Sequence, residues 1–141
     1  HYSDNLIMVV AYVMCGVPGS GKTTTSKKIA EEYGLERFSF DEMHCFRLES
    51  FMQPALETLK KGKSIVLDTV NLRINVRKQV LQILSNVPCK KIVIYMNTPL
   101  EECLYRNANR ETRLPDHVIE STYKSLQPPT LDEGWDEILY Y

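Results

Sequence analysis

The segment Gly16-Val-Pro-Gly-Ser-Gly-Lys-Thr23 has the residue types and the spacing of a phosphate-binding P-loop, G-x-x-x-x-G-K-[ST]. Its glycines let the backbone curl so that successive N–H groups point at one anion, and a helix N-terminus behind the loop adds its positive dipole end. In such loops the lysine contacts the β- and γ-phosphates, and the hydroxyl that follows is a ligand of Mg²⁺. We therefore predict that ATP and magnesium bind at Gly16, Val17, Pro18, Gly19, Ser20, Gly21, Lys22, Thr23 and Thr24.

Asp41 is the first candidate for a catalytic group outside this loop. It follows the strand-like segment 37–40, and ligands of parallel α/β sheets bind at the carboxyl ends of the strands. A carboxylate there can accept the proton of a hydroxyl group that attacks the γ-phosphate. The alternative is that Asp41 caps a helix that begins at Glu42, and the two roles are compatible.

Asp68 closes another strand-like segment, Ile65-Val-Leu67. With the Thr23 hydroxyl, it is predicted to orient Mg²⁺, usually through water, or to hold a catalytic arginine. Asn71 follows in the same loop, and we assign both Asp68 and Asn71 to the acceptor side of the site. The alternative is that Asp68 only caps the turn that includes Asn71.

A cluster of arginines is the third chemical feature. Arg106 and Arg110 lie four residues apart and would share one helix face, with Arg113 in the segment that follows. A mobile lid over residues 106–115 could close on bound phosphates, neutralise charge on the transferred group and exclude water. The alternative is a solvated face paired with neighbouring glutamates. The candidate catalytic residues are then Lys22, Asp41, Arg106 and Arg110.

Basic side chains near Asp41 are candidates for contact with the acceptor. His44 lies one turn beyond Asp41 in the expected helix and Arg47 one turn further, so either could meet a phosphate of the acceptor. A solvated helix surface is the alternative for both. Basic residues of the later helix, among them Arg73 and Arg77, are predicted to be solvated, and they do not favour a track for a nucleic-acid strand.

Composition limits the class of protein. The chain has 141 residues, 43% of them hydrophobic, and its 17 basic and 18 acidic side chains leave a net charge of −1. This is typical of one compact domain, residues 1–141, and excludes a protein that coats nucleic acid through bulk positive charge. The apolar run 6–15 is about half the roughly 20 residues that cross a bilayer. The four cysteines form no Cys-x-x-Cys pair, which favours reduced thiols and a cytoplasmic protein.

Strand-like and helical segments alternate along the chain, which is typical of βα units around a parallel sheet. Helices are expected at 22–33, 42–61, 76–84, 99–109 and 115–126, and strands at 6–14, 37–40, 64–68, 91–97 and, as a short edge strand, 137–141. A capping box of Thr98 and Glu101 is predicted to begin the fourth helix. With right-handed crossovers, these elements build a three-layer αβα sandwich, the α/β fold of P-loop NTPases, with a parallel sheet of four to five strands.

Taken together, these motifs resemble those of the small P-loop kinases grouped around polynucleotide 5′-hydroxyl kinase, over nearly the whole chain. Beyond the P-loop, the resemblance is carried by Asp41, by Asp68-Thr-Val-Asn71, and by Arg106-Asn-Ala-Asn-Arg110 before a helix that starts at Pro115. It implies ATP-dependent transfer of the γ-phosphate to a hydroxyl group.

The resemblance also implies roles for particular residues. The general base would be Asp41, the lid arginine Arg110 and the phosphate-clamping lysine Lys22, while Asp68 would position lid or substrate groups. The family commonly has an arginine three residues after its base, where this chain has His44. It also has threonine at the position that Val70 occupies here.

These departures bear on the acceptor rather than on the phosphoryl chemistry. Our first hypothesis is an ATP- and Mg²⁺-dependent kinase whose acceptor is the 5′-hydroxyl end of a nucleic acid. The same scaffold resembles gluconate kinase, seryl-tRNA kinase, antibiotic phosphotransferases and sugar-nucleotide kinases, so a sugar, antibiotic or tRNA-linked hydroxyl is the alternative. A hypothesis of another class is an ATP-binding switch with no acceptor of its own, and a relative that binds ATP without catalysis is also compatible with the sequence.

Overall fold

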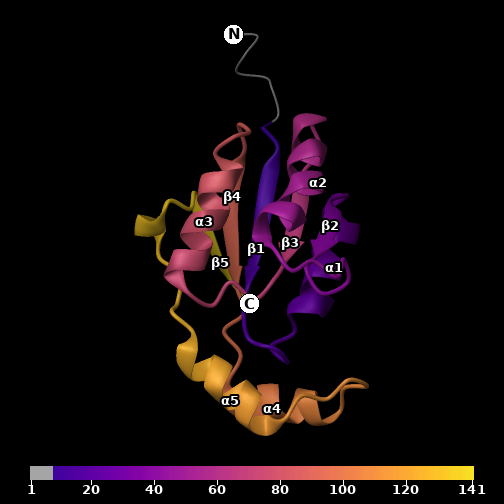
Figure 1. The fold of residues 1–141 in the computed structure, drawn as a ribbon, viewed down its shortest axis with the longest axis vertical. Helices are drawn as coiled ribbons and strands as arrows, with labels where there is room; N and C mark the ends of the chain where they lie inside the picture. Colours follow the sequence, from indigo (N-terminus) through magenta and orange to yellow (C-terminus); the bar gives the residue numbers. More distant parts are fainter. Residues whose placement is uncertain (1–7) are drawn as a thin grey trace.

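The computed structural model describes residues 8–141, and its centre is a five-stranded sheet in the order β2-β3-β1-β4-β5 (Figure 1). All neighbouring strands in this sheet are parallel. The predicted α/β fold with a parallel sheet is confirmed, including the C-terminal edge strand. Residues 6 and 7, part of the first predicted strand, lie outside the described residues. The strands are β1 (Val10–Cys15), β2 (Glu36–Ser39), β3 (Ile65–Asp68), β4 (Lys90–Tyr95) and β5 (Glu137–Tyr140).

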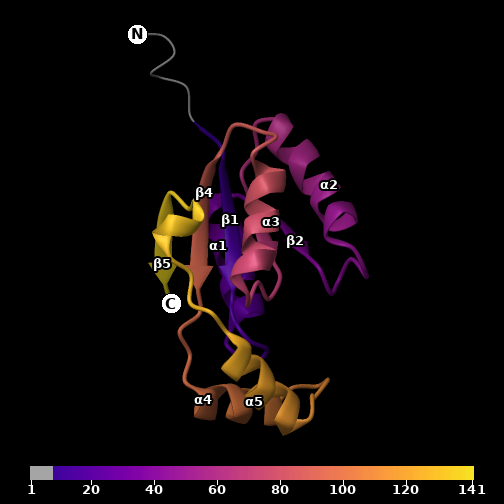
Figure 2. The same ribbon diagram turned by 60° about the vertical axis from the view of Figure 1, so that its left-hand side comes forward.

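Helices cover both faces of the sheet (Figure 2). On one face lie α2 (Leu48–Lys60) and α3 (Ile74–Leu84), and on the other lies α1 (Lys22–Tyr33). Val13 of β1 is buried in the cluster under α2 and α3, while its neighbour Met14 is buried in the cluster under α1. A central parallel strand is apolar on both faces for this reason. In the described part of the chain, no helix is long and apolar enough to span a bilayer.

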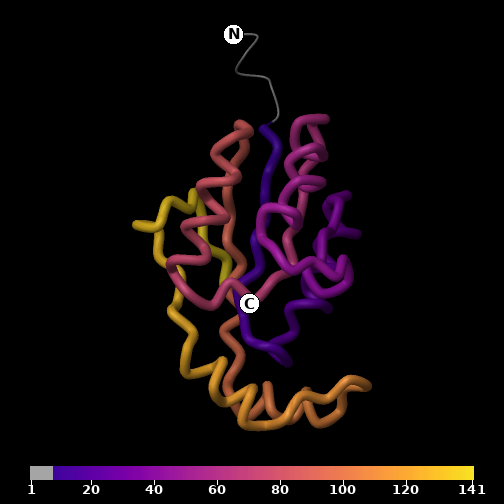
Figure 3. Tube along the Cα trace, in the orientation of Figure 1, coloured from indigo at the N-terminus to yellow at the C-terminus, as the bar shows by residue number. Residues whose placement is uncertain are grey.

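Two further helices lie beyond the carboxyl ends of the strands rather than on a face of the sheet (Figure 3). These are α4 (Leu100–Ala108) and α5 (Asp116–Ser125), which pack against each other. Val17 of the P-loop, Cys103 of α4 and Ile119 of α5 are buried together in a small apolar cluster. The helix pair therefore faces the P-loop, and a short turn, η2 (Leu131–Glu133), follows it before β5.

The start of α2 differs from the prediction. The helix begins at Leu48 instead of Glu42, because the chain first makes a tight turn after β2. The carbonyl of Asp41 accepts the N–H of His44 at 3.2 Å, and His44 takes a left-handed φ of 53°, which a helix cannot contain. The N-cap of α2 is Arg47, so the alternative role of Asp41 as a helix cap is wrong.

The predicted capping box of α4 is also wrong. The helix begins at Leu100 with Pro99 as its N-cap and without a side-chain cap. The Thr98 hydroxyl instead donates a hydrogen bond to the carbonyl of Ser20, at 2.8 Å. This bond joins the start of α4 to the P-loop.

Candidate active site

The P-loop follows β1 and continues directly into α1. Gly19 and Gly21 have φ angles of 85° and 97°, in the region that favours glycine. Gly21 is the N-cap of α1, so the loop ends where free N–H groups and the helix dipole favour an anion. The N–H of Gly16 donates to the carbonyl of Val70 at 3.0 Å, which fixes the loop to the segment after β3.

The close approach of the P-loop to α4 leads to a prediction for Gly19→Ala. A Cβ at Gly19 would lie 2.6 Å from the backbone carbonyl oxygen of Cys103, so the loop or α4 would have to move. Gly34→Ala is the matched control, because Gly34 also has a positive φ, of 67°, but nothing lies within 4 Å of its Cβ position. The positive φ alone should cost each variant about 1–2 kcal/mol of unfolding free energy, and the close contact with Cys103 should cost Gly19→Ala more than this. Gly19→Ala alone should also lose ATP affinity, by about tenfold or more.

Titration calorimetry with ATP and chemical denaturation of both variants measure these effects. Equal ATP affinity in the two variants would show that the contact between the P-loop and α4 does not shape the nucleotide site.

A cavity of about 500 Å³ opens between the P-loop, α4 and the segment 110–114 that follows α4. Lys22, Asp41, Arg106 and Arg110 all line it, although they come from distant parts of the sequence. The cavity is also within the usual size of small-molecule sites, roughly 300–1,000 Å³. Because these charged groups converge beside a P-loop, this cavity is the candidate active site. The other residues that line it are Pro18, Gly19, Gly21, Thr23, Thr24, Val70, Thr112 and Leu114.

The arginines reach the site to different extents. Arg106 forms an exposed ion pair with Glu102 at 2.7 Å, one turn earlier on α4. Its guanidinium also lies over the P-loop, since a Cβ at Gly21 would lie 2.5 Å from Arg106 Nη1. Arg110 lines the cavity just beyond α4, whereas Arg113 pairs with a carboxylate of α5 and does not line it.

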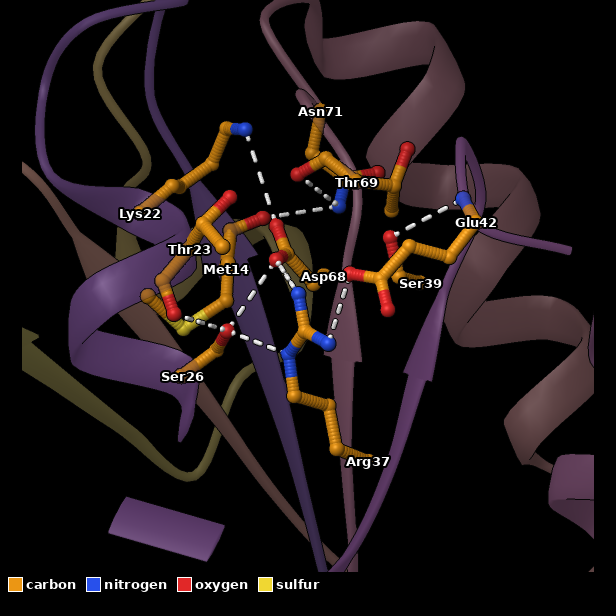
Figure 4. Close-up of polar contacts among 10 residues, drawn as sticks. All are labelled: Met14, Lys22, Thr23, Ser26, Arg37, Ser39, Glu42, Asp68, Thr69 and Asn71. Carbon is orange, nitrogen blue, oxygen red and sulfur yellow. Dashed lines mark hydrogen bonds and ion pairs between the residues drawn. The ribbon is translucent and has the colours of Figure 1, made fainter. Parts of the chain in front are cut away.

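Asp68 lies at the end of β3 between two cations (Figure 4). Lys22 Nζ is 3.6 Å from its Oδ1 atom, and Arg37 Nη2 is 2.6 Å from its Oδ2 atom. Ser26 Oγ lies 3.0 Å from Oδ2 and accepts a hydrogen bond from Arg37 Nε. Burial by itself would raise the pKa of Asp68, but Lys22, Arg37 and Ser26 reverse this and hold the pKa below its usual value. The carboxylate is therefore ionised and holds Lys22 at the P-loop.

Arg37 is a site residue that the sequence did not identify. It lies on β2, next to β3 in the sheet, and its side chain is 13% exposed. Its Nη1 atom also pairs with Glu42 at 2.8 Å. Arg37 therefore shares the negative charge of Asp68 with Lys22 and helps to keep this buried carboxylate ionised.

The segment after β3 is held by a buried cluster. The Asn71 amide, predicted on the acceptor side, is buried and donates to the carbonyl of Met14 at 2.8 Å, and Asn71 does not line the cavity. Arg77 donates to the carbonyl of Asn71 at 2.8 Å and to both carboxylate oxygens of Glu133, at 2.7 and 2.9 Å. The prediction of a solvated Arg77 is wrong, because this side chain is fully buried. Burial raises the pKa of neighbouring Cys15 to about 11, so its thiol is not poised as a nucleophile.

A second cavity, of about 340 Å³, adjoins the first and shares Lys22, Asp41 and Val70 with it. The predicted acceptor-side residues His44 and Arg47 lie on the exposed turn before α2, and neither of these two described residues lines either cavity. Of the four residues predicted on the acceptor side, only Asp68 lines one of these two cavities. The other residues that line the second cavity are Phe40, Leu48, Asp68, Thr69, Val76 and Gln79.

The parallel sheet, with a P-loop between its central strand and α1, defines a domain of the P-loop NTPase class. Residues 45–129, more than half of the chain, match the family model described as AAA domain. The chain belongs to this family.

Three curated relatives are kinases by name. The chain is 28% identical to the bifunctional polynucleotide phosphatase/kinase of Schizosaccharomyces pombe, over 89% of this chain and 32% of that protein. It is 24% identical to the L-seryl-tRNA(Sec) kinase of Methanococcus maripaludis, over 88% of this chain and 55% of that protein. It is 26% identical to a probable gluconokinase of S. pombe, over 86% of this chain and 75% of that protein. The chain thus spans about a third and about half of the first two relatives, and the predicted resemblance to P-loop kinases is confirmed.

Solved structures share the fold. A fungal RNA kinase aligns with a TM-score of 0.76 and 18% identity, over 96% of this chain and 38% of that one. Kti12 of Chaetomium thermophilum, solved in complex with ADP-AlF3, aligns with a TM-score of 0.70 and 19% identity. The alignment covers 93% of this chain and 88% of that one. The sandwich of sheet and helices is therefore that of the P-loop kinases.

Proposed function

We propose that this chain is a phosphotransferase that moves the γ-phosphoryl group of ATP to a hydroxyl group of an acceptor. The observation that carries the proposal is the convergence of Lys22, Asp41, Arg106 and Arg110 on one cavity beside the P-loop. A second cavity adjoins the first and shares the carboxylate of Asp41 with it, which leaves room for an acceptor beside the bound ATP. Relatives named polynucleotide phosphatase/kinase, seryl-tRNA kinase and gluconokinase support a hydroxyl acceptor.

The proposed reaction is an in-line displacement. The acceptor oxygen forms a bond to the γ-phosphorus, the bond from that phosphorus to the β–γ bridging oxygen breaks, and ADP leaves. Asp41 accepts the proton of the acceptor hydroxyl. Lys22 contacts the β- and γ-phosphate oxygens, and Arg106 and Arg110 neutralise the charge of the group in transfer.

Magnesium, when bound, supplies charge neutralisation on the phosphates of ATP. In residues 8–141, no group of three His, Cys, Asp or Glu side chains could hold a metal, so the fit depends on the Thr23 hydroxyl in the larger cavity. Magnesium commonly binds one or two protein oxygens together with phosphate oxygens and water, which this site allows. Both oxygens of Asp68 already face Lys22 or Arg37. We therefore assign Asp68 to holding Lys22 and to water-mediated contact with the ion.

The α4–α5 pair suggests how water is kept out. We infer that the chain is a single domain in which residues 106–115 act as a lid that closes on bound ATP. We also infer that the acceptor enters by the second cavity. A closed lid would suppress hydrolysis of ATP by water. The 5′-end of a nucleic acid is the first candidate acceptor, and a sugar or tRNA-linked hydroxyl is the alternative.

A transfer screen with γ-labelled ATP and Mg²⁺ tests the proposal. The panel contains 5′-hydroxyl DNA and RNA, tRNA, nucleosides, sugars and aminoglycosides, and we expect label on at least one of them. If ATP is hydrolysed at a rate that no acceptor changes, and that Asp41→Asn does not change either, the chain is a nucleotide-binding switch instead.

A further inference from the structure

The second cavity has few positive charges for a site that would receive a phosphate-bearing acceptor. Two carboxylates, Asp41 and Asp68, line it, and Lys22 is the cation among its lining residues. The uncharged polar groups are Thr69 and Gln79. The apolar groups are Phe40, Leu48, Val70 and Val76.

The one cation is already engaged. Lys22 Nζ lies 3.6 Å from Asp68 Oδ1, and Lys22 belongs to the P-loop, where the phosphates of ATP are its second partner. Arg37 lies on the far side of Asp68, is paired with Asp68 and Glu42, and does not line the cavity. An anion that entered this cavity would therefore meet Asp41 without a cation of its own.

The nearby basic side chains on the turn before α2 do not supply a cation to the second cavity. Arg47 is 78% exposed, and its closest ion partner is Glu49 at 3.9 Å. His44 is exposed as well and, like Arg47, is not among the residues that line the cavity. The walls instead offer an apolar surface, on which the Phe40 ring is held by an edge contact with Phe51, with ring centres 5.2 Å apart.

We propose that the unit that enters the second cavity is an uncharged hydroxyl compound with an apolar face, such as a nucleoside or a polyol, and that it carries no phosphate or carboxylate beside its hydroxyl. This rests on the proposed function, because it takes the second cavity as the acceptor site. Within that function it favours an uncharged acceptor over the 5′-end of a nucleic acid, whose first nucleoside carries a 3′-phosphate. An anionic acceptor would lose part of its hydration and gain no ion pair, which disfavours its binding. Thr69 and Gln79 can hydrogen-bond its other hydroxyl or amide groups.

Matched acceptor pairs test the charge preference. Thymidine is compared with thymidine 3′-monophosphate, and sorbitol with gluconate, and a 5′-hydroxyl oligonucleotide is added, all with γ-labelled ATP. We expect kcat/KM to be lower for the anionic member of a pair by about tenfold or more. If an anionic member or the oligonucleotide is preferred, this inference fails and the proposed function stands. If no acceptor gains label, the inference and the proposed function both fail.

A variant with an added cation tests whether the acceptor binds in the second cavity. Gln79→Arg puts a guanidinium on the wall of the second cavity, and Gln82→Arg puts one on an exposed position of the same helix that does not line it. We expect Gln79→Arg to narrow the preference for the uncharged member by about fivefold or more, and Gln82→Arg to leave it unchanged. An equal response of the two variants would show that the acceptor does not bind in this cavity.

Discussion

Asp41→Asn is expected to lower the rate of phosphoryl transfer by about 10²–10⁴-fold while ATP still binds. Asparagine keeps the size of the side chain but cannot take the proton of the acceptor hydroxyl. Asp68 cannot replace it, because Lys22 and Arg37 lie against its carboxylate. Single-turnover transfer from γ-labelled ATP, with calorimetry for ATP affinity, separates the loss of chemistry from a loss of binding.

Glu49→Gln is the matched control for this variant. Glu49 is an exposed carboxylate in the first turn of α2 and lines neither of the two cavities. The control should transfer phosphate at the rate of the unchanged chain. If Asp41→Asn does the same, Asp41 is not the general base and the proposed mechanism is wrong.

The nucleotide side of the site could be predicted because its physics is local. The loop between β1 and α1 requires glycine at positions of positive φ, such as Gly19 and Gly21, and these requirements are visible in a short stretch of sequence. The same holds for the apolar stripe of α2, whose residues Met52, Ala55, Leu56 and Leu59 are all buried. Their i, i+3, i+4 and i+7 spacing is typical of the buried face of a helix, so this face can be read from the sequence although the predicted start of the helix at residue 42 is wrong.

The residues that were missed depend on contacts between distant segments. Arg77 was expected in solvent, because its partner Glu133 lies 56 residues further along and only the folded chain brings the two together. Arg37 was not identified, because its role depends on which strand lies beside β2. The turn at His44 escaped detection because residues 42–47 have acceptable helix propensity, and the packing of the loop overrides it.

Arg77→Met is expected to lower the free energy of unfolding by about 3–5 kcal/mol, because it leaves a buried carboxylate without its cation. Arg77 and Glu133 are 0% and 3% exposed in their side chains, so water cannot replace the lost partner. A domain of this size has about 5–15 kcal/mol in total, so the variant should unfold at much lower denaturant. Lys78→Met is the control, since Lys78 is the exposed neighbour on the same helix and should change stability by about 0.5 kcal/mol or less.

The conservative variant Arg77→Lys distinguishes geometry from charge. The guanidinium makes these bonds from three different nitrogens, to both oxygens of Glu133 and to the carbonyl of Asn71, and a single ammonium nitrogen lacks this planar fork. We expect Arg77→Lys to recover only part of the stability that Arg77→Met loses. Full recovery would show that charge alone holds the segment after β3.

The same ion pair predicts a pH dependence with a definite sign. Burial opposes the charged form of Glu133, but hydrogen bonds from Arg77 and Trp135 hold its pKa below the ordinary value of 4.5. A carboxyl group with a lowered pKa in the folded state stabilises the fold above its unfolded pKa, and this contribution is lost as the pH falls through the folded pKa. The unchanged chain should therefore lose stability below about pH 4.5 more steeply than Arg77→Met. Urea denaturation of both proteins from neutral to acidic pH measures the difference, and parallel curves would show that Arg77 does not lower the pKa of Glu133 in the folded chain.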